Sequence, residues 1–178
     1  MDYDGINYFW LMKSHLRYLT GYPQETIAQV QAALESGRLK SAIVKKYPLG
    51  HHVKSDKALH DYVMEIKRDY MKRSAPISKI KFDKKMDIHG ALGIHYTKPR
   101  IQGNKIKSKV EIRIADIFKE TPEAFLRMVV VHELAHLNEK DHDKAFYRLC
   151  QNMEPDYHQL EFDFRVYMAA DEYEKSFQ

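Results

Sequence analysis

The sequence predicts an α+β fold, and three observations carry this prediction. Apolar residues recur at helical spacing in the first and last thirds of the chain. In the middle third they alternate with polar residues, as in half-buried strands. The 178 residues are 44% hydrophobic and 30% charged, which is ordinary globular composition with enough apolar material for one compact core.

Helices are expected first along the chain. Two short helices fit residues 23–47, with Gly37 as the joint between them. The next helix fits residues 56–73, because its apolar residues form one stripe and Ser55 or Asp56 can cap its N-terminus.

Strands follow in the middle third of the chain. Alternation of apolar and polar residues predicts strands over 77–83, 86–89, 92–97 and 110–114. Residues 98–109 are rich in lysine and contain proline and glycine, and we expect them to form a basic loop.

The last third is expected to be helical again. Thr121-Pro122-Glu123 resembles a helix start, and the helix should run to about Leu137. Further helices are expected over residues 144–153 and 157–175.

Composition excludes several classes of protein. Cys150 is the only cysteine, so neither an intrachain disulfide nor a cysteine metal cluster can form. No run of about 18 apolar residues is available to span a membrane. We therefore expect a cytoplasmic protein without a membrane partner, and the sequence does not indicate an oligomeric state.

Charge is distributed unevenly along the chain. Residues 79–113 carry ten basic and three acidic side chains, whereas residues 114–178 carry seven basic and fourteen acidic ones. Such a basic segment is compatible with an anionic partner, and also with an ordinary solvated face.

The most informative segment is His132-Glu133-Leu134-Ala135-His136. Residues four apart share one face of a helix, so both imidazoles can reach one metal ion. Glu133 lies about 100° round the helix from His132. From there it can act as general base toward a zinc-activated water without being a ligand. Since the preceding run is apolar, this helix is expected to be buried, and a metal would satisfy its polar side chains.

A third ligand is needed for a catalytic zinc site. His142 follows His132 by ten residues, and Glu154 follows His136 by eighteen. Either can complete the site, and three protein ligands leave the fourth position open for water.

Several segments resemble the YgjP-like family of predicted zinc metallopeptidases. The resemblance is carried by Val129–Leu137, Asp141–Tyr147, Met153–Asp163, Ala91–Gly93, Arg100–Gly103 and Glu111–Arg113. A more distant similarity is to the SprT-like proteases. These resemblances imply a minimal zincin-like fold, with a small mixed sheet packed on the active-site helix, and they favour His142 as the third ligand. Glu139 stands where many extended zincin motifs have glycine, so the turn before His142 is expected to differ.

The resemblance also suggests domain limits. Residues 1–17 are expected to be an N-terminal extension, and residues 18–178 a single zincin-like domain. Within that domain, 18–75 should be the helical part and 76–178 the sheet with the active-site helices. Met12 is our hypothesis for the true initiator.

Other residues are candidates for supporting roles. The strand 110–115 could bind an extended substrate through backbone hydrogen bonds. Asp163 or Glu161 could orient a ligand imidazole. The side chains that could contact substrate or an oxyanion are Tyr157, His158 and Arg113.

Together these features predict a zinc metallopeptidase with one zinc per chain, and a peptide or protein as its substrate. Two alternatives stay open. One is a nucleic-acid-associated protease or DNA-binding module that uses the basic segment 79–113. The other is a structural zinc domain, in which Glu133 would have no role.

Overall fold

The computed structural model describes the backbone of residues 14–86, 93–102 and 105–177. It describes their side chains as well, except within residues 87–109. The described chain divides into two compact units. The first comprises Met1–Pro48 with Glu161–Gln178, and the second comprises Leu49–Leu160. Each unit is built from its own elements and is treated separately below.

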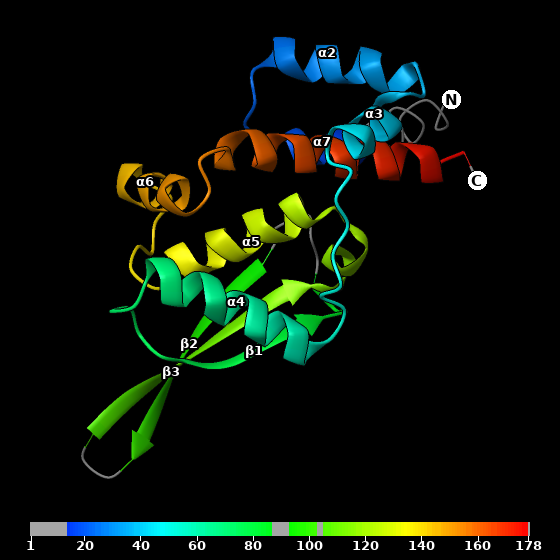
Figure 1. Cartoon of the computed structure of the whole chain (residues 1–178). Helices are drawn as coiled ribbons and strands as arrows, with labels where there is room; N and C mark the ends of the chain where they lie inside the picture. Colours follow the sequence, from blue (N-terminus) through cyan, green and yellow to red (C-terminus); the bar gives the residue numbers. More distant parts are fainter. Residues whose placement is uncertain (1–13, 87–92, 103–104, 178) are drawn as a thin grey trace, which may run out of the picture. The chain divides into compact units, whose positions relative to one another are not determined.

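The first unit is helical in its described part (Figure 1). Its elements are the 3-10 helix η1 (Ser14–Leu19), α2 (Gln24–Glu35), α3 (Leu39–Lys46) and the part of α7 (Tyr157–Lys175) that follows Leu160. Gly37 has φ +67° between α2 and α3, a left-handed conformation that glycine adopts without strain. The predicted joint between two short helices is confirmed.

Acidic residues of α7 tie the first unit together. Asp171 accepts a hydrogen bond from Lys40 at 2.6 Å, and Glu172 pairs with Arg17 at 3.0 Å. Asp163 accepts from Lys46 and from the Tyr47 hydroxyl, each at 2.6 Å. These carboxylates therefore hold η1 and α3 to the C-terminal helix.

The second unit contains the sheet and the helices around it. Its elements are α4 (Asp56–Tyr70), β1 (Ile77–Asp83), β2 (Gly93–Gln102), β3 (Lys105–Ala115), the 3-10 helix η2 (Asp116–Glu120), α5 (Glu123–Ala135) and α6 (Lys144–Met153). The Ser55 side chain caps α4 by accepting from the Ala58 backbone N–H at 3.2 Å. The helices α4, α5 and α6 each begin and end within three residues of their predicted limits, whereas η2 was not predicted.

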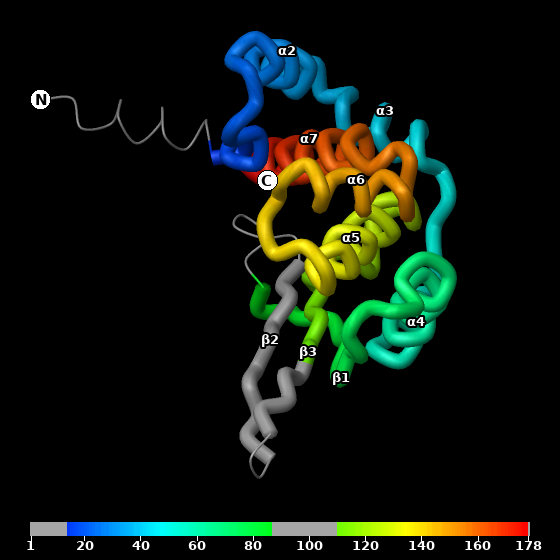
Figure 2. Tube along the Cα trace, turned by 90° about the vertical axis from the view of Figure 1, so that its left-hand side faces the viewer, coloured from blue at the N-terminus to red at the C-terminus, as the bar shows by residue number. Residues whose placement is uncertain are grey.

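The sheet is small and mixed, as predicted. Its strand order is β1-β3-β2, with β1 parallel and β2 antiparallel to β3. Both α4 and α5 lie on one side of this sheet (Figure 1). In a second view α4 lies beside β1, and α5 lies above the sheet (Figure 2). Buried apolar side chains of α5 and β3 make the core of the unit, among them Ile112, Ile114, Phe125 and Val129. The predicted α+β class is confirmed.

The expected basic loop at 98–109 is wrong. Residues 98–102 belong to β2 and residues 105–109 to β3, and the two strands stay in register from Thr97↔Val110 to Gln102↔Lys105. The alternation of lysine and arginine with Ile101 and Ile106 is a strand pattern that the high charge concealed. Pro99 is tolerated because β2 lies at an edge of the sheet.

The strand Val110–Ala115 cannot bind an extended substrate as we expected. It belongs to β3, the middle strand, and pairs with β1 on one side and β2 on the other. Its backbone groups are already used in both ladders, so among the described strands only β1 and β2 have an outer edge.

The described residues test two further sequence predictions only in part. The expected strand 86–89 lies outside the described residues except for Met86. Within the part of the chain that is described, no helix combines the length and the apolar character needed to cross a membrane.

Candidate metal centre

Helix α5 carries two of the histidines. Pro122 precedes its first turn and Glu123 lies in that turn, a favourable place for an acidic side chain. Valine has modest helix propensity, but Val129, Val130 and Val131 are fully buried, so packing offsets it. His132 lies in the last turn and His136 is the C-cap, one helical turn further on.

The third histidine is positioned by the start of α6. Asp143 caps this helix, and its carboxylate accepts from the backbone N–H groups of Ala145 and Phe146 at 2.8 and 3.0 Å. His142 directly precedes this cap. The reversal of the chain between α5 and α6 thus returns His142 to the end of α5.

The three imidazoles converge on one point. The Nε2 atom of His132 lies 3.3 Å from that of His136 and 3.1 Å from that of His142. One ring nitrogen from each of the three residues lies within 4.8 Å of the others. Bonds of about 2.0–2.1 Å to a tetrahedral zinc place ligand nitrogens about 3.3 Å apart. The spacing of the donor atoms therefore fits a zinc-sized cation.

The ring of His136 is oriented for metal binding. Its Nδ1–H donates to the backbone carbonyl of Glu139 at 2.9 Å. A carbonyl can only accept, so Nε2 of a neutral His136 carries the lone pair. Burial lowers the pKa of His136, and the nearby His142 lowers it further, against the opposing effect of the Glu139 carbonyl. Both effects favour the neutral imidazole, whose Nε2 faces the cluster.

Glu139 provides its carbonyl in a turn without left-handed residues. Its own N–H donates to Ala135 at 3.0 Å, and no described residue other than glycine has a positive φ. The turn therefore does not need the glycine of extended zincin motifs. Sequence reasoning missed the Glu139 carbonyl, because a backbone group leaves no signal in residue type.

The ring of His132 has a different partner. Its Nδ1 lies 2.7 Å from the hydroxyl of Tyr157, which is fully buried at the first residue of α7. We expected Tyr157 near substrate or an oxyanion, and that role stays a prediction. The structure places its hydroxyl at Nδ1 of His132, whereas the other two histidines approach Nε2 of this ring.

Phe146 packs against the whole cluster. Its fully buried ring lies 5.0, 4.7 and 4.7 Å from the rings of His132, His136 and His142. An apolar ring in contact with all three imidazoles restricts their rotation and lowers the local dielectric. Its position four residues after His142 is the signal that could have identified it.

Glu133 is buried beside the cluster. Its residue is 1% exposed, and its Oε2 has no hydrogen-bond partner among the described residues. Burial raises the pKa of Glu133 to about 8. A buried carboxyl oxygen without a hydrogen-bond partner costs about 1–3 kcal/mol of stability, a cost that functional sites commonly carry.

Other candidate residues are engaged elsewhere. Glu154, the alternative third ligand, accepts from Arg127 Nε at 2.7 Å. Arg113 pairs with Glu111 and Asp83 at 2.9 and 3.1 Å. His158 is exposed and its ring lies 5.0 Å from that of Tyr147.

The carboxylates expected to orient a ligand histidine have other partners. Asp163 accepts from Lys46 and Tyr47, and Glu161 pairs with Arg165 at 2.8 Å. A tyrosine hydroxyl and a backbone carbonyl occupy the positions where we expected a carboxylate.

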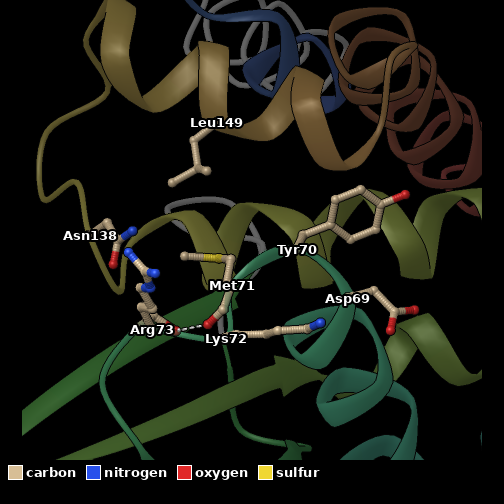
Figure 3. A pocket seen from close by; sticks show the side chains of 8 residues that line it. Asp69, Tyr70, Met71, Lys72, Arg73, Asn138 and Leu149 are labelled. Atoms are coloured by element: carbon tan, nitrogen blue, oxygen red, sulfur yellow. Dashed lines mark hydrogen bonds between the residues drawn. The ribbon is translucent and has the colours of Figure 1, made fainter.

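A cavity lies close to the turn that follows α5 (Figure 3). Its volume is about 360 Å³, and Asn138 contributes to its wall from that turn. The other lining residues are Asp69, Tyr70, Met71, Lys72, Arg73, Ser74 and Leu149. Neither Glu133 nor any of the three histidines lines it, so it is separate from the candidate metal centre.

Comparisons with known proteins identify the family of the chain. The family described as YgjP-like, metallopeptidase domain, matches residues 28–165, which include all three histidines and Glu133. A protein of Escherichia coli (strain K12) named UTP pyrophosphatase is 49% identical over 157 residues, covering 88% of this chain and 94% of the relative. No solved structure matches. Family match and relative together show that this chain belongs to the YgjP-like family, whose metallopeptidase name implies a metal-dependent hydrolase.

Proposed function

We propose that this chain is a zinc-dependent hydrolase of nucleoside triphosphates that releases pyrophosphate, with UTP as a substrate. The observation that carries the proposal is the convergence of three imidazole nitrogens beside a buried glutamate. The UTP pyrophosphatase that is 49% identical over nearly its whole length supports this choice of substrate.

His132, His136 and His142 would hold the metal through Nε2. A cation bound by three neutral imidazoles keeps its full positive charge and supplies Lewis acidity, which makes water acidic and lowers the pKa of a nearby carboxyl. Glu133, as a carboxylate, accepts the proton of the attacking water. Phe146 and the Glu139 carbonyl keep the imidazoles in place.

The reaction balances as a simple hydrolysis. The oxygen of water forms a bond to the α-phosphorus, and the bond from that phosphorus to its bridging oxygen breaks. Pyrophosphate leaves with the electron pair, and the proton passes through Glu133 to solvent. Pyrophosphate is a good leaving group, so the reaction needs no second acid among the described residues.

Charge supports a polyanionic substrate. A donor set without carboxylates leaves the centre strongly positive. A triphosphate would gain from this charge, whereas an uncharged peptide segment would not.

Peptide hydrolysis is the second candidate, and the metallopeptidase description of the family favours it. The same zinc and glutamate would serve a carbonyl as well as a phosphorus. An edge strand such as β2, and not β3, would then have to bind the substrate backbone.

The test is a parallel assay of protein stripped of metal and reloaded with Zn²⁺. UTP, the other nucleoside triphosphates and unstructured casein are each offered, and products are separated by ion-exchange chromatography. We expect UMP and pyrophosphate from UTP. Glu133→Gln should lower turnover by about 10²–10⁴-fold while it retains zinc. Glu65→Gln, on an exposed side chain of α4, should leave turnover unchanged.

Other results would change the proposal. Cleavage of casein without hydrolysis of UTP would establish the peptidase in its place. UTP hydrolysis that survives in Glu133→Gln, or in metal-free protein, would show that this centre does not perform it.

A further inference from the structure

We propose that the cavity next to the turn after α5, here named the phosphate cavity, binds the phosphate group of a small ligand (Figure 3). Its volume of about 360 Å³ is typical of ligand pockets, and all its lining residues belong to the second unit. Because none of the three histidines lines it, this inference requires neither a bound metal nor the proposed function.

Residues 71–74, which follow α4, form a well-held turn in the wall of the phosphate cavity. The Met71 N–H donates to the Lys67 carbonyl at 2.8 Å. The N–H and the hydroxyl of Ser74 both donate to the Met71 carbonyl, at 3.0 and 2.8 Å. These three hydrogen bonds fix the backbone that carries Lys72 and Arg73, so this wall is formed before a ligand binds.

The charges on this wall are mainly positive. Lys72 and Arg73 both line the cavity, and neither has an ion-pair partner among the described residues. Asp69 is the acidic residue that lines it, and its carboxylate is paired with Arg68 at 3.0 Å. Two cations without counterions therefore border a space whose one carboxylate is already neutralised.

A third positive charge is buried behind the same wall. Lys67 is 8% exposed, and its ammonium donates to the carbonyls of Met71 and Ser74 at 3.5 and 3.3 Å. Within the described chain, no carboxylate forms an ion pair with it. Carbonyls that follow a helix carry only partial negative charge, so they compensate a full positive charge incompletely. A nearby anion would stabilise a buried charge of this kind.

Hydrogen-bond donors converge in the phosphate cavity. Figure 3 shows the side chains of Arg73 and Asn138 pointing toward one another. A guanidinium has five N–H donors and no acceptor, and its planar fork matches the oxygens of a phosphate group. An amide adds two further N–H donors. Phosphate oxygens between these two side chains would accept from both.

The number of charges favours phosphate over other anions. A carboxylate would bring one negative charge to three cations, whereas a phosphate monoester brings about 1.5–2. The rest of the wall is apolar and aromatic, with Met71, Leu149 and the ring of Tyr70, which is 45% exposed. Such a wall can also accept the organic part of a phosphorylated ligand.

Titration of metal-free protein with inorganic pyrophosphate tests the inference, because the histidine cluster then holds no cation that could attract the anion. Binding is measured by calorimetry at low ionic strength, where interactions between charges are least screened. The side-chain ¹⁵N–H signals of Asn138 report where the anion binds. UMP is titrated in parallel, to separate an inorganic ligand from a nucleotide.

Two variants remove positive charge from the cavity. Arg73→Gln removes an exposed cation, and Lys67→Met replaces the buried ammonium with an apolar chain of similar length. The matched control is Lys57→Gln, which removes one exposed positive charge at the other end of α4, where Lys57 pairs with Asp61 at 2.7 Å.

We expect one pyrophosphate to bind per chain and to shift the Asn138 signals. Arg73→Gln should weaken binding by about 10–100-fold, because it removes a hydrogen bond between charged groups. Lys67→Met should weaken binding by a smaller factor, since its ammonium acts from behind the wall. Lys57→Gln should change the affinity by less than about twofold, because exposed charges at that distance are screened.

Contrary results are equally clear. A folded parent that binds neither probe at millimolar concentration would overturn the proposal. Equal weakening by Arg73→Gln and Lys57→Gln, or Asn138 signals that do not move, would show general attraction between charges and overturn it too. Tighter binding of UMP than of pyrophosphate would support the site and identify a nucleotide as its ligand. The Asn138 signals of the parent decide the matter even if Lys67→Met does not fold.

Discussion

At the scale of single residues, the centre is defined by contacts to both ring nitrogens of His132 and of His136. In each ring Nε2 points into the cluster while Nδ1 is held by an oxygen. His142 joins them through Nε2 from an exposed position. The site is therefore firmly held on the α5 side and accessible on the side of His142.

Ligand assignment leads to the first prediction at this scale. His142→Ala should weaken zinc binding by more than about 100-fold, since loss of a direct ligand exceeds the loss of a supporting contact. Glu154→Ala should retain one zinc per chain, because Glu154 is paired with Arg127. Metal content and zinc affinity of tag-free protein measure both effects. Zinc lost from Glu154→Ala but kept by His142→Ala would reverse the assignment.

Sequence reasoning reached some of these residues and not others. The spacing of His132 and His136 predicts a shared helical face because an α-helix repeats every 3.6 residues. His142 needed the family resemblance, since spacing alone left Glu154 open. The direction of the Tyr157 hydroxyl depends on how α7 begins and on packing around it, and neither follows from a local pattern.

At the scale of elements, the start of α6 contributes as much as α5 to the geometry of the candidate metal centre. The Asp143 carboxylate accepts two backbone hydrogen bonds, and the residue before it carries the third imidazole. The cap thus fixes both the helix and the point where the chain returns to α5. A helix cap is in this way part of the metal centre.

Removal of the Asp143 cap should affect both folding and metal binding. Asp143→Ala should lower the free energy of unfolding by about 1 kcal/mol and weaken zinc binding about fivefold. Ser55→Ala removes the cap of α4 instead, and should cost similar stability with unchanged zinc binding. Urea unfolding of metal-free protein measures the free energy of unfolding, and competition with a chelator measures the zinc affinity. Equal zinc affinities in both variants would show that the cap does not position His142.

Elements differ in how well their sequences reveal them. The helices α6 and α7 have the limits that were predicted, because capping residues and apolar stripes mark their ends. The β2–β3 ladder was mistaken for a loop over 98–109. Its pairing is a long-range property, and lysine-rich strands satisfy it through backbone bonds that the side chains do not reveal.

At the scale of the whole molecule, the acidic residues of α7 make stability depend on pH. Burial by itself would raise the pKa of Asp171, but hydrogen bonds from Lys175 and Lys40 outweigh it and hold this pKa below its usual value. Burial would also raise the pKa of Glu172, but hydrogen bonds from Ser14 and Arg17 outweigh it and lower this pKa. Both carboxylates therefore stabilise the folded chain when ionised.

The sign of the pH effect follows from these shifts. A carboxylate with a lowered folded pKa contributes fully above its unfolded pKa, and its contribution is lost as the pH falls through the folded value. Asp171→Asn should cost about 1–2 kcal/mol at pH 7 and progressively less toward pH 3. Exposed Asp69→Asn should change stability by less than about 0.5 kcal/mol. Denaturant unfolding across this range measures both, and a cost for Asp171→Asn that does not vary with pH would contradict the assignment.

The three histidines lie within eleven consecutive residues, from His132 to His142. Bringing their ends together closes a short loop, whose entropic cost is small. A cation there would join no distant parts of the polypeptide, so it would not act as a cross-link between early and late segments. Only Tyr157, fifteen residues beyond His142, would have to wait for a more remote part of the chain. A cation would therefore be able to bind the nascent chain once α5 and the start of α6 have formed, and α7 would complete the centre afterwards.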